Sequence, residues 1–147
     1  MARKVFFSFK YKDVSRAMVV RNSWVTQWKE SAGFIDSADF EKIKKQGDQA
    51  VQNWIDKQLE WTSVTVVLLW EKTCNSRWVK YEIKKSIERW NGLLEIDISK
   101  IKNLQQEISD CCGWILPDNY KGYLRFKNDW YNNMGTWIEK AAKEAWK

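Results

Sequence analysis

The segment Val64-Thr65-Val66-Val67-Leu68-Leu69-Trp70 decides the fold class of this chain. It is almost wholly apolar, rich in β-branched residues, and far shorter than the ~18 residues that a membrane span requires. A strand that is apolar on both faces is typical of the middle of a parallel sheet with helices on each side. The segment therefore predicts an α/β fold.

On either side of this strand, strand and helix patterns alternate along the chain. Further strands are predicted at 4–9, at 93–98 and over the short stretch 111–116, and Phe34-Ile35 leaves room for one more. Helices are predicted to begin at Asp13, at Asp48, at Asn75 or Ser76, and at Asn128 or Asp129. This order predicts a three-layer α/β domain with a flavodoxin-like arrangement, in which helices flank a central, mostly parallel sheet of about five strands.

Helical spacing also predicts which side chains face the sheet. The helix after the central strand should turn one row inward, formed by Val79, Ile83, Ile87 and Trp90. Packing against the sheet is likewise expected of Trp24 with Trp28 and of Trp130 with Trp137. Residues Ile101, Leu104 and Ile108 have the spacing of a short amphipathic helix, whereas the polar stretch 36–47 is predicted as an exposed loop with one helical turn.

The composition limits the chemistry that the chain can perform. Its 147 residues fit a single domain, 1–147, and the absence of histidine excludes Ser-His-Asp and Cys-His catalysis and His-ligated zinc or haem. The three cysteines are an odd number with two adjacent, which argues against a zinc site and against a disulfide framework. Cys74 is interpreted as an unreactive loop residue, and Cys111 and Cys112 as buried apolar residues.

The net charge of +6 allows three interpretations. It can serve solubility, or it can attract a polyanionic partner or a small molecule that carries phosphate. The basic residues are scattered among acidic ones, so neither a nucleic-acid nor a membrane partner is expected. The apolar run near the N-terminus is too short for the core of a signal peptide, and a cytoplasmic location is predicted.

A ligand site is expected at the carboxyl ends of the strands, where open parallel sheets bind their ligands. The first strand brings Ser8, Phe9 and Lys10 to this edge, and the central strand brings Trp70 to Thr73. Neither a Gly-x-Gly-x-x-Gly motif nor a Gly-Lys-Ser/Thr loop is present, which argues against a Rossmann cofactor site and a P-loop.

The most informative motif is Ser76-Arg77-Trp78-Val79-Lys80-Tyr81-Glu82, at the start of the helix after the central strand. Trp78 and Glu82 are four residues apart and share a face, which is predicted to differ from the inward row. Spacing alone leaves two interpretations open, because a helical glutamate is usually a solvated surface charge and a neighbouring tryptophan usually packs.

Two segments resemble TIR domains. The first strand Val5-Phe6-Phe7-Ser8-Phe9 is similar to the Val-Phe-Ile-Ser-aromatic opening of that family, and the apolar central strand is followed by Ser-x-Trp-x-x-x-Glu, as in TIR domains. The chain resembles most the bacterial and archaeal branch that includes the TIR protein of the Thoeris anti-phage system. Features shared with that branch extend over nearly the whole chain: Arg16-Ala17, Val20-Arg21-Asn22, Trp54-Ile55 and Trp137-Ile138-Glu139.

The resemblance implies an enzyme that consumes NAD⁺ as its substrate and needs neither a further cofactor nor a metal. The glutamate matching Glu82 would be catalytic, supporting cleavage of the nicotinamide–ribose bond through an oxocarbenium-like transition state. The implied substrate-binding residues are Phe6, Ser8, Phe9, Lys10 and Trp78, with Trp78 beside the base. Stretch 36–47 corresponds to a loop that mediates self-association and gates the pocket in the family.

The resemblance leaves the product open, because either water or an adenine nitrogen can attack the anomeric carbon. Relatives of this branch make a cyclic ADP-ribose-type signal that a separately encoded effector protein senses in anti-phage defence. Lys10 stands where many relatives carry histidine, so it either attracts a phosphate or alters activity, and Trp70 could narrow the pocket. The alternative hypothesis is a non-catalytic TIR-like adaptor that acts through self-association.

Overall fold

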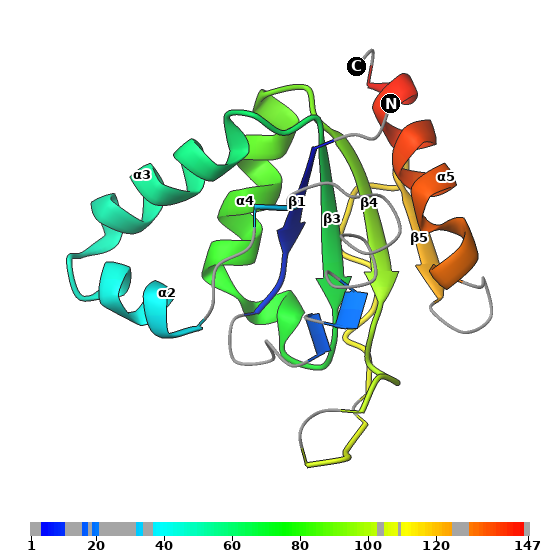
Figure 1. The fold of residues 1–147 in the computed structure, drawn as a ribbon, viewed down its shortest axis with the longest axis horizontal. Helices are drawn as coiled ribbons and strands as arrows, with labels where there is room; N and C mark the ends of the chain where they lie inside the picture. Colours follow the sequence, from blue (N-terminus) through cyan, green and yellow to red (C-terminus); the bar gives the residue numbers. More distant parts are fainter. Residues whose placement is uncertain are drawn as a thin grey trace.

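The computed structural model describes residues 4–10, 16–17, 19–20, 32–33, 37–102, 105–108, 110–124 and 130–145. Within them a five-stranded sheet has the order β2-β1-β3-β4-β5, and every neighbouring pair is parallel (Figure 1). The strands are β1 (Val5–Ser8), β2 (Ala32–Gly33), β3 (Val64–Leu69), β4 (Gly92–Asp97) and β5 (Lys121–Leu124). This is the flavodoxin-like order, so the predicted fold class is confirmed.

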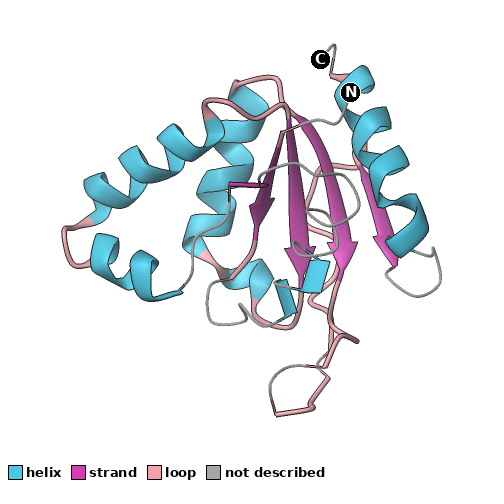
Figure 2. Cartoon of the chain, viewed as in Figure 1, coloured by secondary structure: helices cyan, strands magenta, loops and turns pink. Residues whose placement is uncertain are grey.

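Helices cover both faces of the sheet (Figure 2). They are α2 (Ser37–Lys44), α3 (Asp48–Leu59), α4 (Arg77–Glu88) and α5 (Trp130–Glu144), with a short 3₁₀ helix, η2 (Thr73–Asn75), before α4. Helices α3 and α4 lie on one side of the sheet and α5 lies on the other (Figure 1). None of the helices in the described ranges is long and apolar enough to cross a membrane.

Alternation along the strands assigns each side chain to one of the two faces. Val5 and Phe7 pack with Val64, Val66 and the α5 core, whereas Phe6 packs with the buried residues of α3. All six residues of β3 are buried, because the strand pairs with β1 and β4 and is covered on both faces. The expected position of this strand in the middle of the sheet is therefore confirmed.

The fifth strand lies further along the chain than predicted. Segment 111–116 is irregular, and Lys121–Leu124 pairs with β4 instead. The carboxylate of Glu95 on β4 accepts hydrogen bonds from the backbone amides of Ile115 (2.8 Å) and Leu116 (3.2 Å). A side chain thus satisfies the amides that a strand would have paired with backbone carbonyls.

Two further predictions about local structure are wrong. Most of the predicted loop 36–47 is helical, because α2 spans Ser37–Lys44. Residues 101–102 and 105–108 form turns and bends instead of an amphipathic helix. Several predictions concern residues outside the described ranges and stay predictions. They are the possible strand at Phe34-Ile35, the packing of Trp24 and Trp28, and the helix caps Asn128 and Asp129.

Candidate active site

The candidate site is built around Glu82 of α4. Helix α4 begins after Ser76, whose hydroxyl accepts a hydrogen bond from the backbone amide of Val79 (3.3 Å) as an N-cap. This helix carries Glu82 over the first strand, where the hydroxyl of Ser8 donates to Glu82 Oε1 at 2.9 Å. Ser8 is the last residue of β1, so the carboxylate lies near the carboxyl end of the sheet, where the sequence placed the site.

Glu82 belongs to the inward row of α4, contrary to the sequence prediction. The buried residues of the helix are Val79, Glu82 and Ser86, while Ile87 is 39% exposed and Trp90 is 74% exposed. Polar partners on the sheet explain this orientation: Ser8 binds Glu82, and the hydroxyl of Thr65 on β3 lies 2.7 Å from that of Ser86. An apolar pattern cannot reveal a helix face that is buried against hydroxyl groups.

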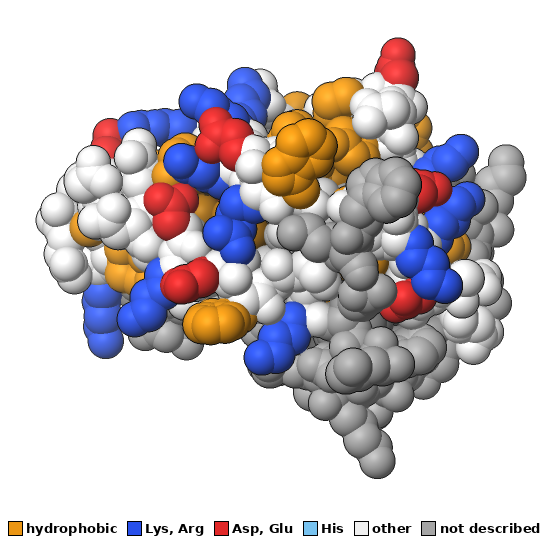
Figure 3. Space-filling model, turned by 90° about the horizontal axis from the view of Figure 1, so that it is seen from above, with side chains coloured by type: hydrophobic (Ala, Val, Ile, Leu, Met, Phe, Trp, Pro, Cys, Tyr) orange, Lys and Arg blue, Asp and Glu red, His pale blue; other side chains and the backbone are white. Residues whose placement is uncertain are grey.

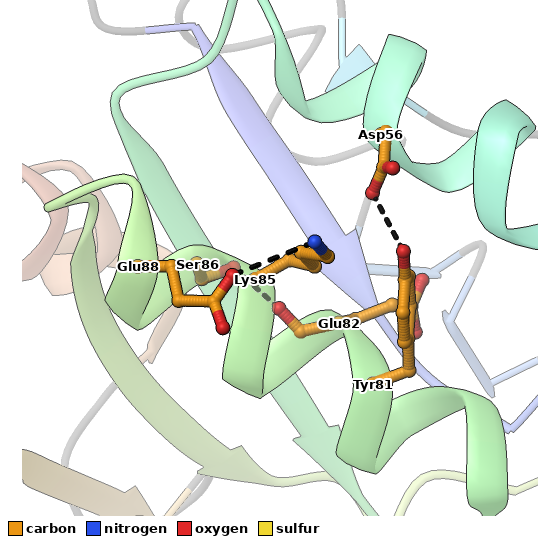
Figure 4. A network of polar contacts seen from close by, with 6 residues as sticks. All are labelled: Asp56, Tyr81, Glu82, Lys85, Ser86 and Glu88. Atoms are coloured by element: carbon orange, nitrogen blue, oxygen red, sulfur yellow. Dashed lines mark hydrogen bonds and ion pairs between the residues drawn. The ribbon is translucent and has the colours of Figure 1, made fainter.

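The backbone of Glu82 is fixed as well as its side chain. The hydroxyl of Ser86 donates to the carbonyl oxygen of Glu82 at 2.7 Å, as Figure 4 shows. On the neighbouring turn, Tyr81 donates from its phenol to Asp56 Oδ1 of α3 at 2.9 Å. Arg77 forms an ion pair with Asp48 at the start of α3. The last two contacts join α3 to the part of α4 that precedes the glutamate.

Trp78 is half-buried and lies in the cluster formed by Phe6 and the buried residues of α3. Its ring meets that of Tyr81 edge to face, with centroids 5.9 Å apart and an interplanar angle of 80°. The guanidinium of Arg77 lies 4.5 Å from the centre of the Trp78 ring. Phe6, Ser8, Trp78 and Glu82 are therefore on the same side of the sheet.

Phe9 and Lys10 are placed differently from this group. Phe9 is buried in the core on the α5 side of the sheet, across from Phe6, and Lys10 is half-buried. Trp70 packs against that same α5-side core, with the Arg16 guanidinium 5.5 Å from its ring centre. Lys10 and Trp70 both follow the carboxyl ends of their strands. Neither is described in contact with the group formed by Phe6, Ser8, Trp78 and Glu82.

Burial dominates the electrostatics of Glu82. The residue is 0% exposed, and burial raises its pKa well above the ordinary glutamate value, which the hydrogen bond from Ser8 lowers only in part. Its second oxygen, Oε2, is buried and accepts no hydrogen bond. Burial therefore favours the protonated form in this closed arrangement, and the unused oxygen becomes available to a ligand donor once the site opens and the group ionises.

Two buried polar residues outside the predicted site residues, Arg16 and Glu95, hold loops elsewhere in the domain. Arg16 is 2% exposed and donates from Nε to the carbonyl of Ile101 (2.6 Å) and from Nη2 to that of Glu107 (2.8 Å). Burial also raises the pKa of Glu95, although the backbone amides of residues 115 and 116 lower it in part. Such residues carry no apolar periodicity, so only their partners in space identify them.

The cysteines correct another expectation. Cys74, in η2, forms a disulfide with Cys112, which joins the segment before α4 to the loop after β4. Cys111 keeps a free thiol whose pKa is raised by burial. The odd number of cysteines is therefore made up of one disulfide and one free thiol. Among the described residues, no cluster of cysteine and acidic side chains has the arrangement of a metal site.

The sheet order and the position of Glu82 define the class of protein. A doubly wound parallel sheet carries a glutamate on the helix after the central strand, and a serine of the first strand is bonded to it, which agrees with the TIR-like domain that the sequence resembles. The family described as "Thoeris protein ThsB, TIR-like domain" matches residues 6–103, and the chain belongs to this family.

A curated relative extends the comparison beyond that match. The chain is 48% identical over 126 residues to a protein of Bacillus cereus (strain MSX-D12) named "Putative cyclic ADP-D-ribose synthase ThsB1". The matched region covers 84% of this chain and 65% of the relative, so the chain spans less than two thirds of the relative's length.

Proposed function

We propose that this protein cleaves the nicotinamide–ribose bond of NAD⁺, with Glu82 as the catalytic residue. The observation that carries the proposal is the Ser8–Glu82 pair, a buried carboxyl group held at 2.9 Å by a strand hydroxyl near the ligand edge of the sheet. The name of the Bacillus cereus relative, a cyclic ADP-D-ribose synthase, supports the same substrate class.

The reaction suits a site without histidine. Nicotinamide departs as a neutral molecule, so its departure needs no general acid. The ribose that remains develops positive charge at the anomeric carbon, as in other glycosidic cleavages. A carboxylate close to that carbon stabilises the charge in a pocket from which water is excluded. One carboxylate and one positioning hydroxyl are then sufficient for bond cleavage.

Catalysis requires that Glu82 become accessible and ionised. It is fully buried in the closed arrangement, where its pKa is raised, so the substrate reaches it only when α3 and the side chain of Trp78 move aside. The Arg77–Asp48 ion pair and the Tyr81–Asp56 hydrogen bond are the links that must yield. Hydration of the opened site lowers the pKa of Glu82 and generates the carboxylate.

The remaining substrate contacts follow from position. Phe6 and Trp78 provide aromatic surface beside Glu82, and we assign the nicotinamide-bearing end of the substrate to them. Lys10, two residues beyond Ser8, is assigned to the phosphates because its charge attracts them. Phe9, which the resemblance implied as a substrate-binding residue, is buried on the opposite side of the sheet, so we assign it to the core and to no substrate contact.

The product assigned to this chain is a cyclic ADP-ribose-type signal, sensed by a separately encoded effector in anti-phage defence in the cytoplasm. Cyclisation rests on the name of the relative, because hydrolysis would use the same glutamate. Partners of the domain are then NAD⁺, the effector and further copies of itself.

Incubation with NAD⁺ and chromatography of the products test the proposal. The wild type should release nicotinamide and a product with the mass of cyclised ADP-ribose, whereas Glu82→Gln and Glu82→Ala should release neither. Glu60→Gln, a change at an exposed glutamate after α3, is the matched control and should behave as the wild type. Linear ADP-ribose would identify a hydrolase. A wild type without activity at high protein concentration would favour the self-associating adaptor.

A further inference from the structure

A second hollow lies at the opposite end of the sheet from Glu82. It has a volume of about 600 Å³ and is enclosed by the end of α4, the start of β4, the loop before β5 and the end of α5. Figure 3 looks onto this end of the molecule and shows a group of apolar side chains bordered by basic and acidic ones. We call this space the edge hollow, and its lining includes Trp90, Asn91, Leu93, Tyr120, Lys121 and Glu144.

Both the backbone conformation and the exposed side chain of Trp90 are unfavourable for the stability of the isolated domain. It has a φ of 61°, in the left-handed region that favours glycine, and its side chain is 74% exposed. The residue ends α4: its amide donates to the carbonyl of Ile87, and the Asn91 amide donates to that of Ser86. A strained backbone that presents an exposed indole over a hollow is an arrangement that proteins retain for binding.

Asn91 provides a hydrogen-bond acceptor without a partner in the wall of the edge hollow. The residue is 3% exposed, and its amide nitrogen donates to the hydroxyls of Thr62 (3.1 Å) and Thr65 (3.5 Å). These hydroxyls have other acceptors for their protons, since Thr62 donates to the Leu59 carbonyl and Thr65 lies 2.7 Å from Ser86. Asn91 Oδ1 is left buried and accepts no hydrogen bond.

The proton of Ser86 fixes the direction of this chain of hydrogen bonds. It is used on the Glu82 carbonyl, so Thr65 must donate to Ser86 and accept from Asn91. The amide of Asn91 is thereby oriented, because turning it over would place its oxygen against oxygens that have no proton to give. A ligand for this oxygen must bring an N–H or O–H group.

The charges around the edge hollow favour the same kind of ligand. Two carboxylates, Glu88 and Glu144, and one ammonium group, Lys121, line it. The Glu88 carboxylate also lies 3.5 Å from Lys85 Nζ, so Glu144 provides most of the attraction for a cation. Aromatic surface from Trp90 and Tyr120 lies beside the acidic groups, and such surface binds flat cations well.

We propose that the edge hollow is a second binding site, for a small aromatic cation that carries N–H donors. Its ring stacks on Trp90, its cationic group is attracted by Glu144, and one N–H reaches Asn91 Oδ1 after a small adjustment of the wall. The site is separate from the one assigned to NAD⁺, although the hydrogen bonds that run from Asn91 through Thr65 and Ser86 end on the Glu82 carbonyl.

Titration of the protein with benzamidine, followed by ligand-observed NMR or calorimetry, tests the proposal. A dissociation constant on the order of 1 mM is expected for a probe of this size. Trp90→Gly should weaken binding about tenfold, because it removes the ring and leaves a backbone that glycine adopts readily. Glu144→Gln should weaken it about threefold, and Trp61→Ala, which removes an exposed indole outside the hollow, should not change it.

Benzoate is the matched probe, since it is flat and of similar size but anionic, and it should bind far more weakly than benzamidine. The proposal is overturned if the wild type shows no saturable benzamidine binding up to about 10 mM. It is also overturned if both Trp90→Gly and Glu144→Gln bind as the wild type, or if benzoate binds as well as benzamidine.

Discussion

Replacing Glu82 by glutamine should change how the stability of the fold depends on pH. Burial raises the pKa of Glu82 in the folded protein, whereas the unfolded chain has the ordinary value of 4.5. Between these two pKa values the folded state keeps a proton that the unfolded state has released. The stability from this proton is fully present below pH 4.5 and is lost as the pH rises toward the folded pKa.

Linkage gives the size of the effect. One proton of difference is worth about 1.4 kcal/mol per pH unit, and allowance for residual protonation of the unfolded chain near pH 5 reduces this to about 1.2 kcal/mol between pH 5 and pH 6. The amide of Glu82→Gln does not titrate, while its Oε1 can still accept from Ser8. Glu95, whose pKa is also raised, is present in both proteins and cancels in the comparison.

Urea denaturation of both proteins at pH 5 and pH 6 measures this difference. The wild type should lose unfolding free energy relative to Glu82→Gln over this interval, with an upper limit of about 1.2 kcal/mol for a carboxyl group that stays protonated in the folded state throughout. Equal pH dependence of the two proteins would refute the reasoning, because it would mean that Glu82 titrates in the folded state as it does in the unfolded chain.

Substitutions at three other positions test the packing described above. Trp90→Gly should raise the unfolding free energy by about 0.5–1 kcal/mol, since it relieves a positive φ at little cost in buried area, whereas Trp90→Ala should give no gain in the same denaturation assay. Gly92→Ala should destabilise by about 1–3 kcal/mol, because a Cβ there would collide with the backbone carbonyl of Ala141, and its thermal midpoint should fall. Glu95→Ala should accelerate amide exchange at residues 115 and 116 by tenfold or more, about 1.4 kcal/mol, and unchanged exchange would exclude the carboxylate as their anchor.

The sequence predicted the parts of the fold that depend on long apolar patterns. The run at 64–69 forms the central strand, and the helix predicted to begin at Asp48 is α3, whose buried residues are Val51, Ile55 and Leu59. Strand β5 was missed because Lys121-Gly122-Tyr123-Leu124 is short and contains a glycine, and because its neighbour 111–116 is more apolar. Pairing with β4 determines which of the two segments forms the fifth strand, and the sequence of either segment alone does not show that pairing.

The candidate site was predicted only through its motif. The resemblance to TIR domains singled out Glu82, but the predicted inward row of α4 was correct only for Val79 and Ile83. Ile87 and Trp90 are exposed, and Glu82 and Ser86 are buried in their place. A buried row of valine, glutamate and serine becomes recognisable only when Ser8 and Thr65 are known to face it. The same holds for Asn91 and Glu95, whose partners are distant in sequence or belong to the backbone.

Release of nicotinamide from NAD⁺ by the wild type and by Glu82→Gln, compared at equal and high protein concentration, tests the central claim most directly. The account predicts release by the wild type and none by the variant, because the amide cannot supply the negative charge that stabilises the ribosyl cation. Release by Glu82→Gln at the rate of the wild type would contradict it.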